Sequence, residues 1–543
     1  MAVAAQVKLY DTTLRDGTQG EGISLSVDDK IKIANKLDQM GVHYIEGGWP
    51  GSNPKDMNFF ERAKDLSLDQ AVITAFGMTR RPGLKAEEDP NLKRILESGV
   101  EAAALVGKTW DFHVTEAVQT SLEENVNMIY DSVRFLKDHD LEVIFDAEHF
   151  FDGFKNNKEY ALKTILAAED AGADCVALCD TNGGSLPSEI AAILTEVQNK
   201  LTVEIGIHCH NDGELGVANT LEAVNAGASQ IQGTINGYGE RCGNANLVSV
   251  IPNLQLKMGI ECVSDEQLKQ LTETSKYLHE LANQTPPNGQ PFTGKSAFAH
   301  KGGMHVSAVL KHPETYEHVI PEKIGNERRV LVSELSGQSN LLFKAKELGL
   351  SLDKSNPAVK ETIEKMKDME HKGYQYEAAE ASFELLIRNG MGENHDYFRL
   401  DHFKIITHKE KEGSFTTEAV VKMIIKDQTV MTAAEGNGPV NALDHALRKA
   451  IGEFYPLVHE MYLSDYKVRV LDEAEATAST VRVLIESSDG KETWSTIGVS
   501  ANIIEASWHA LVDSIRYYFM KQRSRLEEVE LFSSMPTEGV KNH

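Results

Sequence analysis

Two histidines separated by a single residue carry the first chemical signal in the chain, in the stretch GIHCHNDGELG that begins at Gly206. In a β-strand, alternate side chains lie on the same face, so His208 and His210 are expected to point one way and Cys209 the other. Two neutral imidazoles on one face offer two lone pairs to a metal ion. Structural histidines at a strand end account for this pair equally well, so other residues must decide.

Polar side chains gather where the sequence predicts that strands end. They are Arg15 and Asp16, Glu46, Glu148, Asp180 and Thr181, His208 and His210, and Glu240, Arg241 and Asn244 in the loop after the eighth strand. Charges brought together at one rim cost desolvation energy unless something pairs them. A network of ion pairs accounts for the carboxylates and arginines, but not for both histidines and the asparagine. The pattern therefore favours a metal site.

The elements that must position these residues alternate regularly from residue 7 to about 260. Eight short β-like runs are separated by amphipathic helical stretches, which predicts an α/β fold with an N-terminal (β/α)8 TIM barrel. Four of the predicted helices end in glycines suited to a left-handed C-cap: Gly41, Gly99, Gly172 and Gly227. A doubly wound open sheet is the alternative, but no GxGxxG follows the first strand.

The rest of the chain predicts two further regions. Residues 282–305 are rich in Pro, Gly and polar residues and read as a linker, and 320–400 is mostly helical and charged. The stretches TAAEGNGPVNALDHALRKAI (432–451) and TIGVSANIIEASWHALVDSI (496–515) align at an offset of 64 residues. Each follows β-like runs, which predicts a C-terminal α+β domain of two βββα-like repeats.

These signals set the expected domain boundaries. Residues 1–280 form the catalytic barrel, 281–402 the linker and helical subdomains, 403–530 the C-terminal regulatory and dimerisation domain, and 531–543 a flexible tail. A repeat domain far from the barrel motifs is expected to regulate or dimerise the protein rather than catalyse.

The composition limits the partners of the protein. A net charge of −27 argues against nucleic acid or an anionic membrane as the main partner. The five cysteines lack zinc-ribbon spacing and are expected to be reduced thiols in the cytoplasm. The N-terminal stretch lacks the pattern of a signal peptide, and no apolar run approaches transmembrane length. A soluble cytoplasmic protein is expected.

Four motifs now carry a family resemblance. DTTLRDGTQGEG, GIHCHNDGELGVANTLEAVNAGA, GYGERCGNANL and GNGPVNAL…GVSANIIEASWHAL resemble the 2-isopropylmalate/homocitrate/citramalate synthases, over the whole chain. Within that family LYDTTLRDGTQGEGISLSVDDK and YIEGGWPGSNPKD are most similar to the citramalate branch. Isopropylmalate synthases usually carry RDGEQ, whereas Thr18 stands here in place of that glutamate.

The resemblance implies an acyltransferase that joins the methyl carbon of acetyl-CoA to the carbonyl of a 2-keto acid, pyruvate in the citramalate branch, and then hydrolyses the thioester. A divalent cation binds and polarises the keto acid in such chemistry. Asp16, His208 and His210 match the metal ligands of the family, with Asn244 as a nearby fourth candidate. This mixed set of nitrogen and oxygen donors suits Mn, Zn or Mg without choosing among them.

Residues around the metal take their expected roles from the same resemblance. Arg15 is expected to oppose the developing oxyanion. Glu46 is counted with it among the catalytic residues, as a salt-bridge partner that holds it in place. Thr181 matches a residue that contacts the keto acid carboxylate, and Gln19 is expected to line the same rim. The size of the acceptor pocket is expected to depend on residues near strand ends 3 to 5: Phe76, Leu105 and Asp146.

Proton removal from the acetyl methyl needs a base. Glu148 and His305 match the active-site glutamate and histidine of the family, the latter supplied by the linker of the same chain or of a dimer partner. Tyr316 matches a tyrosine near this pair, and His300 is the competing histidine. His149 is expected to face away from the site if its strand is regular. For the nucleotide of acetyl-CoA, Arg80 and Arg81 are candidates only.

The C-terminal domain resembles the feedback module of these synthases, and isoleucine, the end product of the pathway, is the effector expected in the citramalate branch. The small residues expected to leave room for it are Gly436, Gly438, Ala442, Ser500 and Ala506. The alternative is that they only let the two halves pack closely. A homodimer is expected.

Three other functions stay open on the sequence. Isopropylmalate or homocitrate synthesis would need a larger acceptor pocket. A metal-dependent carbon–carbon lyase on the same barrel is disfavoured by the long C-terminal repeat. A non-catalytic amino-acid sensor would need none of the catalytic set, so its complete presence argues against that function.

Overall fold

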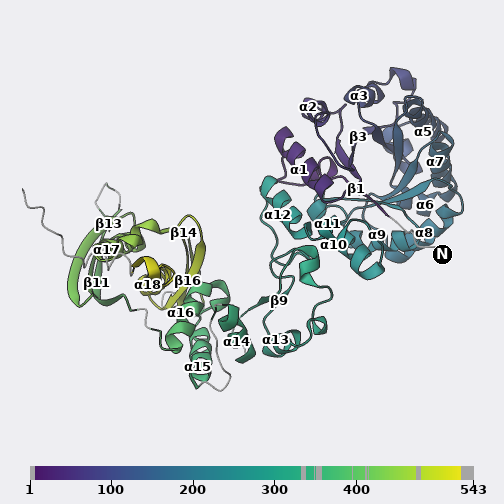
Figure 1. Cartoon of the computed structure of the whole chain (residues 1–543). Coiled ribbons are helices and arrows are strands. Elements are labelled where there is room, and N and C mark those ends of the chain that lie inside the picture. The colour runs from purple at the N-terminus through teal and green to yellow at the C-terminus, as the bar shows by residue number, and fades with distance from the viewer. Residues whose placement is uncertain are drawn as a thin grey trace, which may run out of the picture. The chain divides into compact units, whose positions relative to one another are not determined.

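The computed structural model (Figure 1) describes residues 7–331, 338–347, 349, 357–393, 396–409, 413, 415–471 and 479–526. The expected tail at 531–543 lies outside these residues. The chain forms two compact units. The first runs through Phe298 and includes Glu317–Arg328, and the second consists of Ala299–Tyr316 and the chain from Arg329 onward.

The first unit confirms the predicted (β/α)8 barrel, because eight parallel strands close on themselves in the order β1 to β8, with β8 pairing with β1. The strands are β1 (Lys8–Asp11), β2 (Tyr44–Gly48), β3 (Val72–Met78), β4 (Ala102–Lys108), β5 (Glu142–Glu148), β6 (Cys175–Asp180), β7 (Glu204–Cys209) and β8 (Gln230–Gly233). Parallel neighbours require a crossover, and helices supply it after each strand.

Helices surround the barrel, and those before β8 are the crossovers between successive strands (Figure 1). They are α1 (Val27–Gln39), α2 (Pro54–Ala63), α3 (Pro90–Ser98), α5 (Leu122–Lys137), α7 (Lys158–Asp170), α8 (Pro187–Gln198), α9 (Gly216–Asn225), α10 (Leu247–Asn253), α11 (Asp265–Leu268) and α12 (Leu271–Leu281). Shorter helical turns include η1 (Asp16–Gln19), α4 (Asp111–His113), η3 (Val114–Val118) and α6 (Phe150–Asn156). The predicted cap glycines Gly41, Gly99, Gly172 and Gly227 all have positive φ, between 72° and 104°.

The barrel strands alternate between two apolar environments. Tyr10, Phe76 and Ala104 belong to a cluster inside the barrel. Their sequence neighbours Leu9 and Leu105 belong to the larger core between strands and helices. Because successive strand residues point to opposite faces, this alternation decides which residues can reach the barrel mouth.

Part of the expected linker packs against the barrel. Phe292 and Phe298 are buried in the barrel core, and His279 Nε2 lies 3.1 Å from Gln290 Oε1. Ile324 is also buried there, and its carbonyl accepts a hydrogen bond from Thr272 Oγ1. These apolar side chains explain why a stretch rich in Pro and Gly folds onto the first unit.

The second unit begins with short elements and helices: β9 (Ala299–His300), α13 (Gly303–Val309), β10 (Arg329–Val330), α14 (Gln338–Glu347), α15 (Pro357–His371) and α16 (Glu380–Gly390). Two antiparallel three-stranded sheets follow, each with a helix. The first half is β11 (Phe398–Lys409), β12 (Phe415–Ile425), β13 (Gln428–Gly436) and α17 (Pro439–Gly452), and the second is β14 (Tyr462–Val470), β15 (Val481–Ser488), β16 (Thr493–Ser500) and α18 (Ile503–Lys521).

The two halves confirm the predicted βββα repeat down to single hydrogen bonds. Thr432 Oγ1 donates to the carbonyl of Ala446 at 2.8 Å. Thr496 Oγ1 donates to the carbonyl of Ala510, also at 2.8 Å. Both residues of the second bond stand 64 positions after those of the first, so the sequence offset is also the structural offset.

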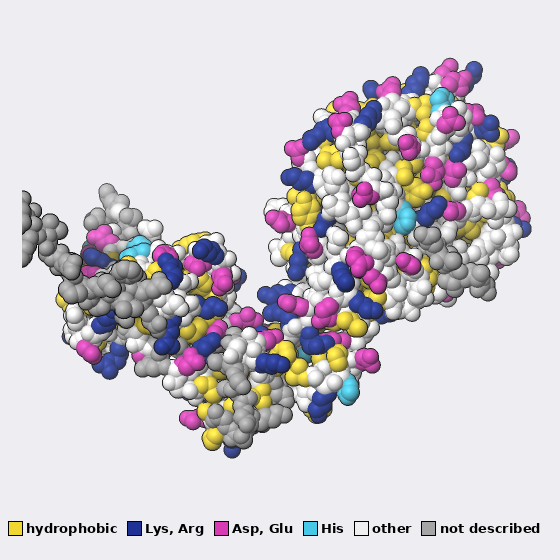
Figure 2. Space-filling model, in the orientation of Figure 1, with side chains coloured by type: hydrophobic (Ala, Val, Ile, Leu, Met, Phe, Trp, Pro, Cys, Tyr) yellow, Lys and Arg dark blue, Asp and Glu magenta, His cyan; other side chains and the backbone are white. Residues whose placement is uncertain are grey.

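Charge is spread over the surface of each unit. Figure 2 shows acidic and basic side chains interspersed on the visible face of the barrel, with no large field of one sign. Among the described residues, no helix is long and apolar enough to cross a membrane.

Candidate metal and substrate site

A cavity of about 250 Å³ opens at the carboxyl-terminal mouth of the barrel. Its lining brings together side chains from most of the strand ends: Arg15, Asp16, Gln19, Trp49, Phe76, Met78, Val106, Lys108, Asp146, Glu148, Cys179, Thr181, His208, His210, Glu240 and Arg241. Active sites of such barrels lie at this end, because loop residues can vary there without disturbing the packed interior.

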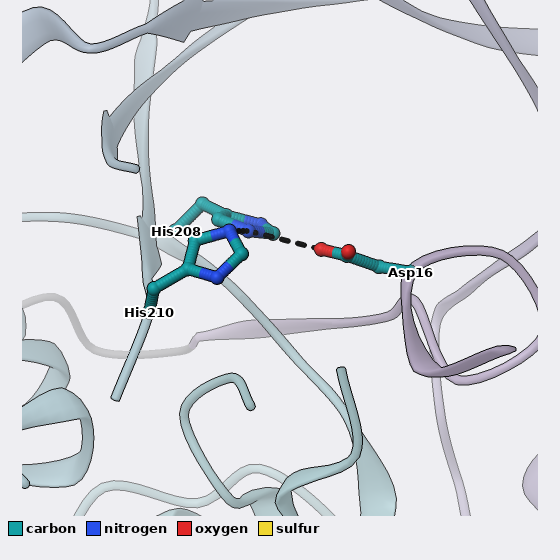
Figure 3. Close-up of side chains that lie close together, drawn as sticks. All are labelled: Asp16, His208 and His210. Atoms are coloured by element: carbon teal, nitrogen blue, oxygen red, sulfur yellow. Dashed lines mark hydrogen bonds and ion pairs between the residues drawn. The ribbon is translucent and has the colours of Figure 1, made fainter. Parts of the chain in front are cut away.

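Asp16, His208 and His210 form the centre of this cavity. The two imidazoles turn toward the carboxylate of Asp16 (Figure 3). His208 Nε2 lies 3.3 Å from Asp16 Oδ2 and 3.4 Å from His210 Nε2. One ligand atom from each of the three residues lies within 4.8 Å of the others, and all three residues are buried.

Arg15 and Asp16 were predicted at the end of the first strand, but the structure places them elsewhere. The first strand ends at Asp11, whose carboxylate accepts hydrogen bonds from Thr13 N and Thr13 Oγ1, both at 2.9 Å. This local bonding turns the chain out of the strand. Arg15 and Asp16 therefore lie in the loop and the short helix η1, not at the end of a strand.

His210 also lies one residue past the end of β7. An isolated antiparallel bridge pairs it with Asn244 in the loop after β8. That bridge continues the local strand geometry, so His208 and His210 still share a face as predicted. Cys209 between them is buried in the core on the other side.

A chain of hydrogen bonds orients His208. Gln232 Nε2 donates to Asp146 Oδ1 at 2.9 Å, and Gln232 Oε1 lies 3.0 Å from His208 Nδ1. With its amide oxygen facing the ring, Gln232 accepts a hydrogen bond from the Nδ1–H group of His208, which leaves Nε2 directed at Asp16. Such outer contacts set the tautomer of metal-binding histidines. Nothing in the sequence pattern singled out Gln232.

The protonation states of Asp16 and His210 suit a cation. For His208, the hydrogen bond and charge of Asp16 outweigh burial and raise the pKa, so a bound cation would displace its proton. Burial opposes ionisation of Asp16, but the charge of Arg15 and the hydrogen bond from His208 hold the pKa of this carboxyl well below its usual range. Burial, and then the neighbouring His208, lower the pKa of His210 to about 3, so its ring is neutral. An ionised carboxylate beside a neutral imidazole is the donor set that divalent metals require.

Two buried atoms have no hydrogen-bond partner in the described part of the chain: His210 Nδ1 and Asn244 Oδ1. Buried polar atoms without partners are uncommon and call for an explanation. The amide nitrogen of Asn244 donates to the carbonyl of Tyr238 at 3.0 Å, so its oxygen is the end left over. These residues fit a divalent cation with mixed nitrogen and oxygen ligands.

Arg15 is held by a carboxylate behind it. Its Nε lies 2.5 Å from Glu46 Oε2, and Tyr10 Oη donates to Glu46 Oε1 at 3.0 Å. The guanidinium carbon sits 3.9 Å from the centre of the Phe76 ring. Burial would lower the pKa of Arg15, but Glu46 and Asp16 outweigh it and raise the pKa, so the group stays cationic.

Glu46 was predicted at a strand end, among the catalytic residues. It lies in the middle of β2, is fully buried and does not line the cavity. Its contacts are with Arg15 and Tyr10. Glu46 is therefore a positioning residue for Arg15 rather than a group that touches substrate.

On the opposite wall, Glu148 forms an ion pair with Lys108, which the sequence analysis missed. Lys108 is the last residue of β4, and its place at a strand end is the signal that could have identified it. Thr181 Oγ1 accepts the backbone N–H of His149 at 2.9 Å, which leaves its own proton available to donate. Gln19 lies on the rim, as expected.

The strand is not regular at His149, whose φ is +56°. Its Nδ1 lies 3.1 Å from Asp152 Oδ2, on the neighbouring helix α6. Arg80, a candidate for the nucleotide, is buried and pairs with Glu124 and Asp131. Its guanidinium already has two carboxylate partners, which argues against that role.

Leu105 was expected to contact the substrate, and the structure contradicts this. Leu105 is fully buried in the core between strands and helices. Its neighbour Val106 lines the cavity instead. Neighbours on a strand point to opposite faces, so the prediction was wrong by one residue. Phe76 and Asp146 do line the cavity.

Trp49 is a cavity residue that the sequence analysis did not single out. Its Nε1 donates to Asn91 Oδ1 at 2.5 Å, and its ring meets Phe76 edge to face at 5.7 Å. Its backbone N–H donates to Asp56 Oδ2 at 3.0 Å. The buried Lys30 pairs with Asp56 at 2.7 Å, so a buried ion pair fixes the loop that carries the indole.

The remaining predicted catalytic residues lie in the second unit. His305 is exposed on α13, and its ring stacks on Tyr316 with 4.2 Å between centroids. Tyr316 is 47% exposed, so both rings are accessible from solvent. The competing His300 is in β9, which pairs with β10.

The residues predicted for an effector lie at strand-to-helix turns of the two halves. Gly436 ends β13, Gly438 caps α17 and Ser500 ends β16. Ala442 and Ala506 are buried in the helices. A Cβ on Gly436 would lie 2.4 Å from the backbone nitrogen of Ala442, so close packing of strand and helix requires glycine there.

Comparison with known proteins divides the chain into three matches. Residues 6–278 match the HMGL-like family, 292–374 the homocitrate synthase post-HMGL domain-like family, and 377–519 the LeuA allosteric (dimerisation) domain. An (R)-citramalate synthase of Geobacter sulfurreducens is 54% identical over 96% of this chain and 99% of its own length.

Two further relatives differ in their degree of similarity. An (R)-citramalate synthase of Aquifex aeolicus is also 54% identical, over 96% of this chain and 99% of its own length. A 2-isopropylmalate synthase of Methanocaldococcus jannaschii is 31% identical, over 95% of each chain.

Proposed function

The chain belongs to the (R)-citramalate synthase family, within the LeuA-type acyltransferases, and we propose that it condenses acetyl-CoA with pyruvate to give citramalate and CoA. The observation that carries the proposal is the buried cluster of Asp16, His208 and His210 beside the Arg15–Glu46 pair in one cavity. The resemblance of the sequence and the geometry of the site thus support the same reaction.

A divalent cation held by Asp16, His208 and His210, with Asn244 as a fourth candidate, would polarise the carbonyl of the keto acid and neutralise its carboxylate. Arg15 lies beside this cluster, with its Nη1 3.6 Å from Asp16 Oδ1. When the new carbon–carbon bond forms, the π electrons of the carbonyl move to its oxygen. The fixed cation of Arg15 opposes that negative charge without having to reorganise.

Thr181 is assigned to the carboxylate of pyruvate, since its hydroxyl proton is available at the cavity wall. Glu148 and His305 are assigned to proton removal from the acetyl methyl. Lys108 holds Glu148 by an ion pair, and Tyr316 supports the ring of His305. The resulting carbanion attacks the keto carbon, and water then hydrolyses the thioester to release CoA.

We also propose the finer roles of the protein. The reaction would serve isoleucine biosynthesis, with isoleucine as a feedback inhibitor at the strand-to-helix turns around Gly436 and Ser500. The LeuA-type domain supports a homodimer. His305 is then supplied by its own chain or by the partner subunit.

Thiol release from acetyl-CoA tests the function. Purified protein is assayed with pyruvate, 2-ketobutyrate, 2-ketoisovalerate and 2-ketoglutarate, each with and without a chelator. Release that is strongest with pyruvate and is lost with the chelator supports the proposal. A preference for a larger acceptor overturns the substrate, and no release from folded, metal-loaded protein overturns the reaction.

Subunit mixing decides how His305 is supplied. Arg15→Ala and His305→Ala subunits are each expected to be inactive. In a mixed dimer, supply from the partner leaves one site with both lesions and the other intact, so activity returns. Supply within the chain leaves one lesion in each site, so the mixture stays inactive.

A further inference from the structure

Asp146 belongs to the expected acceptor pocket, but its side chain does not suit the methyl group of pyruvate. It lies in β5, is buried and lines the barrel cavity. In register with it stand Val106 on β4 and Ala177 on β6, and Val106 is in register with Met78 on β3. Strand residues paired in register share a face of the sheet. The carboxyl group therefore interrupts an otherwise apolar row of the wall.

The rows on either side of this one differ in character. Toward the rim, Lys108 and Glu148 are in register and form an ion pair. Toward the barrel interior, Phe76 and Ala104 are in register and belong to the apolar cluster inside the barrel. The wall thus passes from a charged rim to an apolar interior, and Asp146 lies at the boundary.

The hydrogen bonds of Asp146 leave one of its oxygens over. Oδ1 accepts a hydrogen bond from Gln232 Nε2 at 2.9 Å, whereas Oδ2 has no hydrogen-bond partner among the described residues. Burial, and then the charge of Glu46, raise the pKa of Asp146 to about 6, so its surroundings compensate the carboxylate poorly. Holding Gln232, and through it His208, accounts for Oδ1 alone. Oδ2 remains as an acceptor for a ligand in the cavity.

Asp146 lies close to the place assigned to the keto acid, since the charges of His208 and Arg15 both act on it. The proposed function puts the carbonyl oxygen of the keto acid between the cation held by His208 and the guanidinium of Arg15. The carboxylate of the keto acid is assigned to Thr181. The third group on the keto carbon is then left to face the wall that contains Asp146.

A hydroxyl group on this third substituent can donate a hydrogen bond to Oδ2, which the methyl group of pyruvate cannot do. We propose that the site also condenses acetyl-CoA with 3-hydroxy-2-oxo acids, of which hydroxypyruvate is the smallest, and that Asp146 recognises their hydroxyl group. The inference rests on the proposed function, because it concerns the same cavity and the same reaction.

The reaction balances as it does for pyruvate. A proton leaves the acetyl methyl, and its carbon bonds to the keto carbon of hydroxypyruvate. The π electrons of the carbonyl move to its oxygen, which takes up a proton. Water then hydrolyses the thioester, and CoA leaves as the thiol. The product is 2-hydroxy-2-(hydroxymethyl)butanedioate, which is citramalate with one more oxygen.

Two acceptors of similar size test the proposal, because hydroxypyruvate carries a hydroxyl group where 2-ketobutyrate carries a methyl group. Thiol release by the full-length, metal-loaded protein gives kcat/KM for both and for pyruvate, and mass spectrometry identifies the products. We expect kcat/KM for hydroxypyruvate to exceed that for 2-ketobutyrate by about tenfold or more, as for a hydrogen bond to a charged group. Turnover of pyruvate with a ratio of one or less overturns this inference alone. No turnover of any acceptor overturns the proposed function as well.

Two variants separate recognition from the intrinsic reactivity of hydroxypyruvate. Asp146→Leu keeps a branched side chain but removes the acceptor, so the ratio should fall by about tenfold or more. Gln232→Met is the matched control, because it also breaks the contact with His208 but retains the carboxylate. It should lower turnover with both acceptors and keep the ratio. An unchanged ratio in Asp146→Leu, or an equal fall in Gln232→Met, overturns the proposal.

If Asp146→Leu does not fold, Asp146→Asn takes its place. The amide oxygen can still accept the hydrogen bond from Gln232, while the amide nitrogen puts a donor in the position of Oδ2. The ratio should then fall by about threefold or more, because a charge-assisted hydrogen bond becomes a neutral one. A ratio equal to that of the parent protein overturns the proposal.

Discussion

The barrel site and a cavity of about 420 Å³ lined by α15, α16 and α18, the C-terminal cavity, each hold a carboxylate, but its pKa shifts in opposite directions at the two sites. Asp16 lies next to Arg15 and His208, and its pKa falls well below the usual range. Burial raises the pKa of Asp513 to about 6, because it outweighs the hydrogen bond from Ser382 and the more distant charge of Arg516. The difference shows that burial alone does not decide whether a carboxyl is ionised. The charges that the fold brings close to it decide as well.

The two sites also differ in how firmly their charges are held. In the barrel, Glu46 holds Arg15 from behind, and Gln232 does the same for His208. Such support is what a site needs in order to meet charge that develops during a reaction. In the C-terminal cavity, the basic side chains Lys365, Arg399 and His509 have no ion-pair partner among the described residues.

The largest effect is expected when the Asp16 carboxylate at the centre of the barrel cavity loses its charge. Asp16→Asn should lower turnover by about a thousandfold or more, because it removes the anionic ligand of the cation. Bound metal, measured on the purified variant, should fall in parallel. Asp28→Asn, which alters a surface ion pair with Arg62, is the control and should keep both. Near-normal activity with normal metal content in Asp16→Asn would contradict the ligand assignment.

The next largest effect is expected when the ion pair that holds the Arg15 guanidinium is weakened. Glu46→Gln keeps a hydrogen-bond acceptor for Arg15 and Tyr10 but removes the charge that fixes the guanidinium. We expect kcat to fall by about ten- to a hundredfold with little change in the KM for pyruvate, as for loss of an interaction felt in the transition state. A rise in KM alone would show that Glu46 serves substrate binding instead.

A smaller effect is expected from Trp49, which lines the wall of the barrel cavity. Trp49 is fixed by Asn91 and by the Lys30–Asp56 pair, and it backs Phe76. Trp49→Ala should raise the ratio of kcat/KM for 2-ketobutyrate to that for pyruvate by about tenfold, since one methylene is worth about 1–3 kcal/mol in a closed pocket. Phe112→Ala, which removes another aromatic side chain, one that is 54% exposed, is the control. An unchanged ratio would remove Trp49 from the acceptor wall.

The smallest effect concerns stability at the C-terminal cavity. A carboxyl whose pKa is raised in the folded protein holds its proton more tightly there, so stability is greatest below the ordinary value of 3.8 and falls as the pH rises through about 6. Asp513→Asn should remove that fall. We expect the variant to gain about 1 kcal/mol relative to the parent above this range, after discounting for solvent access to the cavity.

Thermal unfolding of both proteins on either side of pH 6 measures this difference. His509 borders the same cavity and carries an ionisable imidazole. His509→Gln is therefore the control and should retain the pH dependence assigned to Asp513. If His509→Gln removes it instead, the imidazole is the group responsible.

Much of the fold followed from local patterns. The eight βα units, the four cap glycines and the repeat at an offset of 64 were all visible in the sequence, because helix periodicity, strand periodicity and left-handed caps depend on neighbours along the chain. A rim of polar side chains was also predicted, since parallel strands bring their carboxyl ends to one mouth, and the family resemblance picked out Asp16, His208 and His210 from it as metal ligands. The resemblance to a family then supplied the reaction.

The tertiary structure alone decided which face each residue uses and which charges meet. Leu105 and Val106 are equally apolar in sequence, yet one packs in the core and the other lines the cavity. Lys108, Gln232 and Trp49 gained their roles through partners 24 to 42 residues away, namely Glu148, His208 and Asn91. Asp513 and Ser382 meet across 131 positions of the chain. Sequence periodicity determines the elements, but contacts between distant segments, and hence burial and electrostatics, exist only once the elements have packed.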